Sequence, residues 1–274
     1  MKVGIIGGTG QMGKFFSQVF TQAGYEVSVS GRKTALSNKD LVVQSDLIII
    51  TVPIHSTIPV IQEISPYLKQ EQLLCDLTSL KSEPVQAMLQ TNADVIGLHP
   101  MFGPTVRTLQ GQTIVMTPAR CSEEQIQMLQ SLFKSQGARV TITTPEHHDK
   151  MMAIIQGLTH FKALVMAETM RRLGITPQDT EPFMSPIYRI ETSVAGRILA
   201  QDPTLYAEIL NENPEIHNVL KTCCSSAEDL AGIIKSGDRE KFVHQFLADR
   251  SWFGEYCTQS LEETDRLIAA MVKI

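Results

Sequence analysis

Residues 2–13 of this chain read Lys2-Val3-Gly4-Ile5-Ile6-Gly7-Gly8-Thr9-Gly10-Gln11-Met12-Gly13, an apolar strand that runs directly into the pattern G-x-G-x-x-G. In this pattern Gly8 allows a tight turn, Gly10 lets the backbone approach a pyrophosphate, and Gly13 lets the next helix pack on the strand. A helix expected from about Gln11 to Ala23 then points free N–H groups at the anion. The stretch predicts a dinucleotide-binding fold.

The residues around this loop are the candidates to bind the nucleotide. A second strand at Glu26–Ser30 follows the helix where the fold requires it, so a nicotinamide or flavin nucleotide is favoured over a glycine turn that serves packing alone. The predicted cofactor-binding residues are Gly8, Thr9, Gly10, Gln11, Met12, Gly13, Ser30, Arg32, Val52 and Pro53.

The end of the second strand bears on which nucleotide binds. Domains that prefer NAD usually carry Asp or Glu there, about 20 residues past the glycines, to bind the ribose 2′-hydroxyl. This chain has Ser30, Gly31, Arg32 and Lys33 instead. Arg32 can grip a 2′-phosphate through two hydrogen bonds and Ser30 can donate one, which favours NADP over NAD. The alternative is that Arg32 and Lys33 are solvated loop charges.

Composition limits the class of protein. The chain has 274 residues and a formal net charge of −5, and its Lys and Arg residues form no stripe, so neither nucleic acid nor an anionic membrane is an expected partner. No apolar run is long enough to span a membrane, and glycines break the first one, so we expect no signal peptide. The cysteines lack C-x-x-C spacing, which is typical of reduced thiols in a cytoplasmic protein and predicts no metal site. They are Cys75, Cys121, Cys223, Cys224 and Cys257.

The chain divides into two parts with different periodicity. Residues 1–145 alternate short apolar runs with helical stretches, which predicts an α/β domain with a Rossmann-type, doubly wound sheet whose parallel strands are covered on both faces. After Pro145 the strand pattern stops, and residues 146–274 predict an all-helical C-terminal domain. The predicted strands are Lys2–Gly7, Glu26–Ser30, Leu47–Val52, Leu73–Asp76, Val95–Leu98, Thr113–Thr117 and Val140–Thr143. The predicted helices are Gln11–Ala23, Ser56–Leu68, Glu83–Gln90, Ser122–Gln136, Glu146–Leu173, Pro186–Gln201, Pro203–Asn211, Pro214–Ser236 and Arg239–Thr264.

Polar side chains follow the strands at the edge of the sheet where ligands bind. Ligands of an open α/β sheet sit beyond the carboxyl ends of its strands. Ser79 and Lys81 follow the fourth predicted strand, and His99 follows the fifth. We therefore expect these three side chains to converge beside a nicotinamide. His55, after the third strand, is either close to the cofactor or only a turn partner.

The helical part adds two histidines and two arginines. His148 and His160 lie about 120° apart around one expected helix, so only a wide cleft could use both. Arg189 and Arg197 are separated by about 80° after two turns and share a face. Two arginines near a cofactor cleft suggest a substrate with carboxylates. Arg189 could instead join helices through a carboxylate such as Glu191.

Several motifs are similar to those of one enzyme family. The run Gly97-Leu98-His99-Pro100-Met101-Phe102-Gly103-Pro104 resembles the signature of prephenate dehydrogenases, the enzymes of tyrosine biosynthesis. Further matches occur in order along nearly the whole chain, at Val52–His55, Ser185–Arg189, Gly196-Arg197, Ala200–Pro203 and Trp252–Tyr256. The similarity is strongest to the dehydrogenase half of bifunctional chorismate mutase–prephenate dehydrogenases.

The resemblance implies an activity and a role for each candidate residue. The reaction is oxidative decarboxylation of prephenate to 4-hydroxyphenylpyruvate, with hydride transfer to NAD(P). His99 would accept the hydrogen bond of the 4-hydroxyl as the catalytic base, which suits a neutral imidazole, with Ser79 as its catalytic neighbour. Arg197 would bind the ring carboxylate, and Arg189, His160 and Lys81 would be further substrate contacts. The family also implies a homodimer joined through the second domain.

The chain departs from the family pattern in two places, and other functions stay open. It starts at the cofactor strand, so either it is monofunctional or a preceding mutase domain has been removed. It also lacks the acidic residue that bifunctional members tend to carry after the second strand, which leaves NAD in doubt. Arogenate, which has an amine in place of the side-chain keto group of prephenate, is an alternative substrate.

Two rival functions are less consistent with the residues. A β-hydroxyacid dehydrogenase carries Asn four residues after a Lys in the long helix, but here Ile154 follows Lys150 and Met166 follows Lys162. A non-catalytic redox sensor that binds a nucleotide would not require His99, Ser79 and two arginines to meet in one cleft.

Overall fold

The computed structural model describes residues 1–272, which form two compact units. The first, the nucleotide unit, comprises Met1–Met152 with Ala207–Asn213. The second, the helical unit, comprises Ala153–Tyr206 with the chain from Pro214 onward. The nucleotide unit thus extends past residue 145 and takes in part of a later helix, while the division into residues 1–145 and 146–274 stays a prediction about folding domains.

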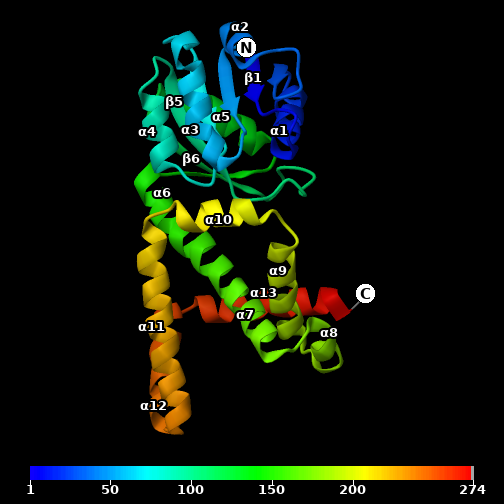
Figure 1. The fold of residues 1–274 in the computed structure, drawn as a ribbon, viewed down its shortest axis with the longest axis vertical. Helices are drawn as coiled ribbons and strands as arrows, with labels where there is room; N and C mark the ends of the chain where they lie inside the picture. The colour runs from blue at the N-terminus through cyan, green and yellow to red at the C-terminus, as the bar shows by residue number, and fades with distance from the viewer. Residues whose placement is uncertain (273–274) are drawn as a thin grey trace. The chain divides into compact units, whose positions relative to one another are not determined.

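A seven-stranded sheet forms the centre of the nucleotide unit, in the order β2-β1-β3-β4-β5-β6-β7 (Figure 1). All seven predicted strands are present, as β1 Lys2–Ile6, β2 Glu26–Ser30, β3 Leu47–Ile50, β4 Leu73–Asp76, β5 Asp94–Pro100, β6 Thr113–Arg120 and β7 Arg139–Ile142. Strands β1 to β5 are parallel, as predicted.

The last two strands differ from the parallel arrangement that the sequence predicts. Strand β6 pairs antiparallel with β5, and β7 is parallel to β6. Residues 101–112 form no helix between β5 and β6, whereas a parallel crossover usually requires one. The chain therefore turns back on itself after β5, and the sheet is mostly rather than entirely parallel.

Both faces of the sheet are covered, which explains the continuous apolar runs of its central strands. In β3, Leu47 and Ile49 belong to one buried cluster while Ile48 and Ile50 belong to the other. Helices α1 (Gln11–Gln22) and α5 (Glu123–Ser135) contribute to the first cluster. Helices α2 (Asn38–Gln44), α3 (Ile54–Ile64) and α4 (Ser82–Leu89) contribute to the second. The strand period of two thus sorts the side chains onto two helical layers.

Local signals set the ends of these helices. Ser122 and Gln125 form the reciprocal capping box at the start of α5 that their spacing indicates. Helix α3 begins earlier than predicted, at Ile54, and ends in the short 3-10 helix η1 at Ser65–Tyr67. Helix α2, which was not predicted, is capped by the Ser37 side chain.

The rest of the chain is helical. The expected helix over Glu146–Leu173 is found as α6 Pro145–Met152, the π-helix η2 Ala153–Leu158 and α7 Thr159–Leu173. It is followed by α8 Pro177–Thr180, the 3-10 helix η3 Glu181–Phe183, α9 Pro186–Leu199, α10 Pro203–Asn211, α11 Glu215–Ser236, α12 Arg239–Phe253 and α13 Tyr256–Val272. Figure 1 shows α12 returning alongside α11.

The expected single helix over Arg239–Thr264 is wrong. Gly254 has a φ of +57°, outside the right-handed helical region, and the chain breaks there into α12 and α13. Glycine adopts positive φ at no steric cost, so the break falls at this residue.

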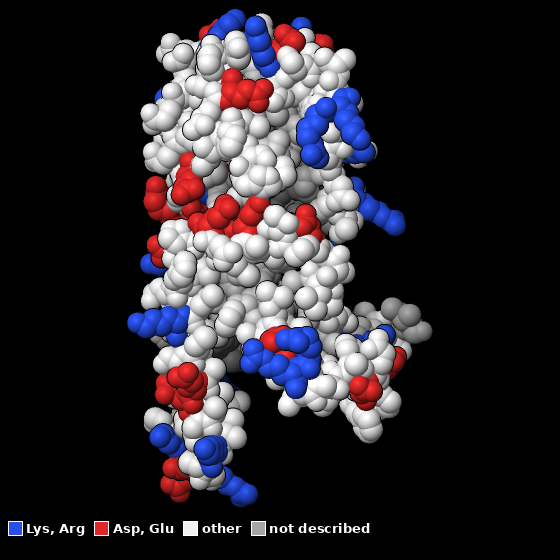
Figure 2. Space-filling view, in the orientation of Figure 1, with Lys and Arg blue, Asp and Glu red and all other residues white. Residues whose placement is uncertain are grey.

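Charged side chains of both signs lie on the surface. On the face drawn in Figure 2, Lys and Arg are interspersed with Asp and Glu. Within residues 1–272, no helix combines the length and the apolar character that a bilayer crossing requires.

Candidate active site

The glycine loop joins β1 to α1 with very little space around its backbone. Gly7, rather than the predicted Gly8, takes the positive φ of the turn, at +80°. A Cβ on Gly13 would lie 2.5 Å from the Gly7 carbonyl oxygen, so only glycine lets α1 pack this closely on the loop. Helix α1 begins after Gly10 with no side-chain cap on its first turn. Its N–H groups and positive end are therefore suited to a phosphate.

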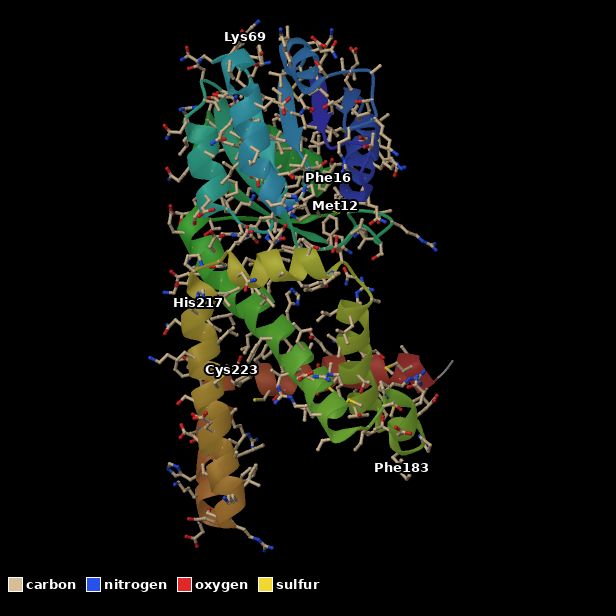
Figure 3. All side chains as sticks on the ribbon, in the orientation of Figure 1. Met12, Phe16, Lys69, Phe183, His217 and Cys223 are labelled. Carbon is tan, nitrogen blue, oxygen red and sulfur yellow. The ribbon has the colours of Figure 1, made fainter. Side chains whose placement is uncertain are left out.

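Met12 lies in the first turn of α1, and its side chain contributes to packing. Figure 3 shows Met12 one turn before Phe16 on this helix. Phe16 is fully buried in the cluster formed with α5, and Met12 is partly buried against the same cluster. The Met12 side chain is thus used at least in part for packing.

The end of β2 lies beside the glycine loop, and its residues differ in exposure. A Cβ on Gly31 would come within 2.7 Å of the Thr9 hydroxyl, so the two loops are neighbours. Ser30 is buried and donates a hydrogen bond to Asn38 Oδ1 at 2.7 Å. The predicted hydrogen bond from Ser30 to a 2′-phosphate is therefore not supported by this geometry. Arg32 and Lys33 are exposed.

The segment after β3 holds the other predicted cofactor residues. Val52 is partly buried against the cluster that includes α3, and Pro53 is the N-cap of α3. His55, in the first turn of α3, makes a hydrogen-bond contact through Nδ1 with Oε1 of Glu208 of α10. His55 thus has a tertiary partner as well as its place in the turn.

His99 stands near the end of β5 and is 3% exposed. Its Nδ1 lies 2.8 Å from His148 Nε2, and His148 Nδ1 lies 2.8 Å from Asp149 Oδ1. The Asp149 carboxylate also accepts the backbone N–H groups of Lys81 at 2.9 Å and Ser82 at 2.8 Å. The start of α6 is thereby tied to the ends of β4 and β5.

Lys81 is completely buried, and its surroundings do not support direct contact with substrate. Its ammonium group donates to Asp76, whose carboxylate also accepts the hydroxyl of Thr78. The loop that contains Ser79 therefore closes on a buried ion pair. The structure brings Lys81 close to His99, as predicted, but in a position where its charge acts on the imidazole through space.

The protonation of this cluster follows from burial and neighbouring charge. Burial, His148 and the positive charge of Lys81 hold the pKa of His99 well below its ordinary value, with Asp149 opposing them. Burial lowers the pKa of Lys81, while Asp76 opposes that shift. Burial would raise the pKa of Asp149, but hydrogen bonds from His148, Ser82 and Lys81 outweigh it and the net shift is downward. His99 is thus a neutral imidazole near pH 7.

A second group of candidate residues lies within the helical unit. The rings of His160 on α7 and Tyr206 on α10 meet edge to face, with centroids 4.9 Å apart. Burial lowers the pKa of His160, and within residues 1–272 its buried Nδ1 atom has no hydrogen-bond partner. Burial raises the pKa of Tyr206, and the charge of Arg197 opposes this, so Arg197 lies near the phenol. We call His160, Arg197 and Tyr206 the helical-unit cluster.

Arg189 lies on the same helix as Arg197 but in different surroundings. It lines an open pocket with Gln178, Glu181 and Ser193. Glu191, considered above as a partner for Arg189, instead accepts from Lys162 Nζ at 3.1 Å and joins α9 to α7. Within residues 1–272, Glu191 is therefore engaged by Lys162, while Arg189 faces the open pocket.

Family models match most of the chain. The model described as prephenate dehydrogenase, nucleotide-binding domain, matches residues 22–142, and that described as prephenate dehydrogenase, dimerization domain, matches residues 144–248. The chain belongs to the prephenate dehydrogenase family. The resemblance read from its motifs is thus confirmed.

Relatives and solved structures agree with this assignment. This chain is 33% identical to a probable arogenate/prephenate dehydrogenase of Methanocaldococcus jannaschii. The match covers 99% of this chain and 65% of that protein. The chain is also 33% identical to the T-protein of Haemophilus influenzae, spanning 97% of its length and 71% of that protein. Its fold is similar to that of prephenate dehydrogenase from A. aeolicus, crystallised with hydroxyphenyl propionate and NAD+ (TM-score 0.72, 18% identity, 93% of this chain and 98% of that one).

Three residues of these clusters were not predicted as site residues from the sequence, and a fourth, His148, was named there as a candidate without a role. The three are Asp76, Asp149 and Tyr206. An adjacent His-Asp pair at the start of the helix after the last strand is a usable signal, since a carboxylate next to an imidazole commonly orients it. Asp76 was visible as an acidic residue closing a buried strand. Tyr206 carries no such signal, because its partner lies 46 residues earlier in the chain.

Proposed function

We propose that this protein oxidises and decarboxylates prephenate to 4-hydroxyphenylpyruvate, with NADP as the hydride acceptor. The observation that carries the proposal is the buried, neutral His99 at the end of β5, held by a second imidazole. Arogenate is the alternative substrate and NAD the alternative cofactor. Five free cysteines support a cytoplasmic location.

The glycine loop fits a dinucleotide. The loop backbone is closely packed, and the start of α1 has no side-chain cap, so its N–H groups can bind the pyrophosphate. We propose that Arg32, which is exposed and follows Gly31 beside this loop, binds a 2′-phosphate. When bound, the oxidised nicotinamide supplies the position that accepts a hydride.

His99 acts on the 4-hydroxyl of the substrate. As the hydride leaves the ring carbon with its electron pair, the imidazole accepts the hydroxyl hydrogen bond and stabilises the developing carbonyl. Loss of carbon dioxide from the quaternary carbon opposite it in the ring releases an electron pair, which passes through the ring double bonds to the developing carbonyl and makes the ring aromatic. The hydroxyl proton then stays with the phenol oxygen, so the reaction releases no net proton.

The helical-unit cluster supplies groups that recognise carboxylates. Arg197 can bind a carboxylate through two parallel hydrogen bonds. In the same cluster, the buried Nδ1 atom of His160 can make a further contact with the substrate. We propose that Arg197 binds the ring carboxylate and that Arg189 and His160 assist. The buried Lys81 is assigned an electrostatic role on His99 in place of substrate contact.

Steady-state kinetics with four substrate and cofactor pairs test this proposal. We expect reduced nicotinamide with prephenate and NADP at the highest kcat/KM. A higher kcat/KM with arogenate than with prephenate would make arogenate the substrate. If the protein binds the nucleotide but reduces no cofactor in any of the four pairs, it is a nucleotide-binding protein and not a dehydrogenase.

Replacing Arg197 with alanine is expected to raise the KM for prephenate roughly tenfold to a hundredfold, with a smaller effect on kcat. The change removes a charge-assisted contact that is worth about 1.5–3 kcal/mol. Arg172→Ala is the matched control, because Arg172 is an exposed arginine of the same unit that pairs only with Glu168 among the contacts described. An unchanged KM together with a lower melting temperature would make Arg197 a structural residue.

Replacing Arg32 with alanine is expected to remove most of the preference for NADP while leaving kcat/KM with NAD nearly unchanged. A partly exposed arginine on a 2′-phosphate contributes about 1–3 kcal/mol, or roughly tenfold to a hundredfold in kcat/KM. Lys69→Ala controls for the loss of one positive charge; Figure 3 shows Lys69 far from Met12 within the nucleotide unit. If the wild-type kcat/KM with NAD equals or exceeds that with NADP, the assignment of Arg32 is wrong.

We propose that the protein is a homodimer held by the helices that follow Pro203. The matching dimerization-domain model covers residues 144–248. Helices α12 and α13 have no buried residue among those described, and Trp252 is 90% exposed. Covering such apolar side chains is the usual reason for association. Sedimentation equilibrium should give twice the chain mass, whereas a monomer mass at working concentration would reject the dimer.

A further inference from the structure

Three side chains of the nucleotide unit form a buried chain of hydrogen bonds that ends at the proposed base. Asp149, His148 and His99 are linked through two contacts of 2.8 Å each. Their exposed fractions are 6%, 1% and 3%. A chain of this kind is shielded from water, so the proton positions along it are set by the partners themselves.

The position of each proton follows from what the partners can donate. An ionised carboxylate only accepts hydrogen bonds, and Asp149 already accepts two backbone N–H groups, so His148 must carry a proton on Nδ1. A neutral His148 then offers Nε2 as an acceptor. His99 must donate from Nδ1 to reach it. A neutral His99 with its proton on Nδ1 has an unprotonated Nε2, the form that a hydroxyl can donate to.

We propose that His148 and Asp149 are positioning residues that fix the proton of His99 on Nδ1 and so keep Nε2 as the atom that receives the substrate hydroxyl. This inference rests on the proposed function of His99. Neither His148 nor Asp149 touches the reacting atoms in this account. They act only through the His99 ring, as an orienting partner does for other catalytic histidines.

The charges around His99 agree with a neutral ring. The described titratable groups that act on it include His148 and Asp149 of α6 and Lys81, which precedes α4 and is paired with Asp76 of β4. The Lys81 ammonium opposes a second positive charge, and burial acts in the same direction on the pKa of His99. The reverse arrangement, with a cationic His148 donating from Nε2, would place the His99 proton on Nε2 and block the base.

His148 is the better residue to change, because Asp149 has a second, structural task. The Asp149 carboxylate binds the N–H groups of Lys81 and Ser82 at the start of α4, so any variant there also loosens two helices. His148→Phe keeps a ring of similar size in a buried place and removes both nitrogens. His148→Gln restores an oxygen that can accept from His99 Nδ1. His147→Phe is the matched control, since His147 is exposed on the same helix.

The test has a kinetic part and a spectroscopic part. For His148→Phe we expect kcat to fall roughly 10–100-fold with the prephenate KM within about threefold of wild type. His148→Gln should recover most of this loss, and His147→Phe should behave as wild type. A kcat for His148→Phe within about twofold of wild type would overturn the proposal.

Nitrogen NMR of the ligand-free wild-type protein measures which ring nitrogen of His99 carries the proton, without any turnover. We expect the His99 ring to show a protonated Nδ1 and an unprotonated Nε2 near neutral pH, and the two nitrogens of His148 to show the same pattern. A His99 ring protonated on Nε2 would overturn the inference. If the wild-type protein reduces no cofactor but shows the expected tautomer, the proposed function fails while the proton arrangement stands.

Discussion

Replacing His99 with asparagine is expected to lower kcat by about 10²–10⁴-fold, the usual contribution of a general acid–base group. The side chain lies at the end of β5 in a buried cluster, so its removal takes away the only base proposed for the 4-hydroxyl. Cofactor affinity should stay near the wild-type value, because the glycine loop is a separate segment. Nucleotide binding measured by fluorescence and kcat measured at saturating prephenate separate the two effects.

His217→Asn is the control for this change. His217 is an exposed histidine on α11, labelled in Figure 3, and has no role in the proposed chemistry. It should leave kcat unchanged. A His99→Asn variant that retains more than about half of wild-type kcat would remove His99 from the mechanism.

The dependence of kcat/KM on pH should also show that His99 must be neutral for catalysis. Catalysis needs neutral His99, and its pKa in the folded protein lies well below the ordinary 6.5 because of burial, His148 and Lys81. As pH falls, kcat/KM should therefore hold through 6.5 and drop only at lower pH, when His99 becomes protonated. An acid limb at or above 6.5 would mean that these groups do not depress the pKa.

Breaking the buried ion pair between Asp76 and Lys81 is expected to lower the free energy of unfolding by about 3–5 kcal/mol. Both side chains are 0% exposed, so in Asp76→Leu the ammonium group stays out of water without its counter-charge. The double variant with Lys81→Met should recover most of the loss, since no buried charge then remains. Urea unfolding of the single and double variants measures these differences.

The exposed pair between Lys162 and Glu191 provides the contrast. These side chains are 68% and 49% exposed, and Lys162→Met should cost no more than about 1 kcal/mol. If the Asp76→Leu variant is as stable as the Lys162→Met variant, Asp76 and Lys81 do not form a buried ion pair.

The sequence predicts those features of the fold that depend on neighbouring residues. The apolar runs at Leu47–Ile50 and the capping pair Ser122 and Gln125 act locally, and both are found as predicted. The reversal of β6 depends on a connection without a helix, and the break at Gly254 depends on one backbone angle. The sequence pattern did leave the connection from β5 to β6 without a helix, so the reversal could have been inferred from it, whereas the backbone angle at Gly254 is not contained in a hydrophobic pattern.

The candidate site was predictable to a similar extent. Strand ends and motifs single out His99, but its partner His148 lies 49 residues away and meets it only in the folded chain. Ser30 was expected to donate a hydrogen bond to a phosphate, but its hydroxyl donates to Asn38 of the unpredicted helix α2. Lys81 was expected at the substrate and lies buried against Asp76. The His99 contact joins residues 49 positions apart, whereas Ser30 and Lys81 meet partners only 8 and 5 positions away, so in those two cases the local fold of the chain decided the outcome.

A product balance on one reaction tests the central claim most directly. Prephenate labelled in its ring carboxylate is incubated with the protein and NADP, and reduced cofactor, labelled carbon dioxide and the aromatic product are measured together. The account predicts one of each per prephenate consumed, with 4-hydroxyphenylpyruvate as the aromatic product. Prephenate consumption without reduced cofactor, or an aromatic product that has lost the 4-hydroxyl oxygen, would contradict it.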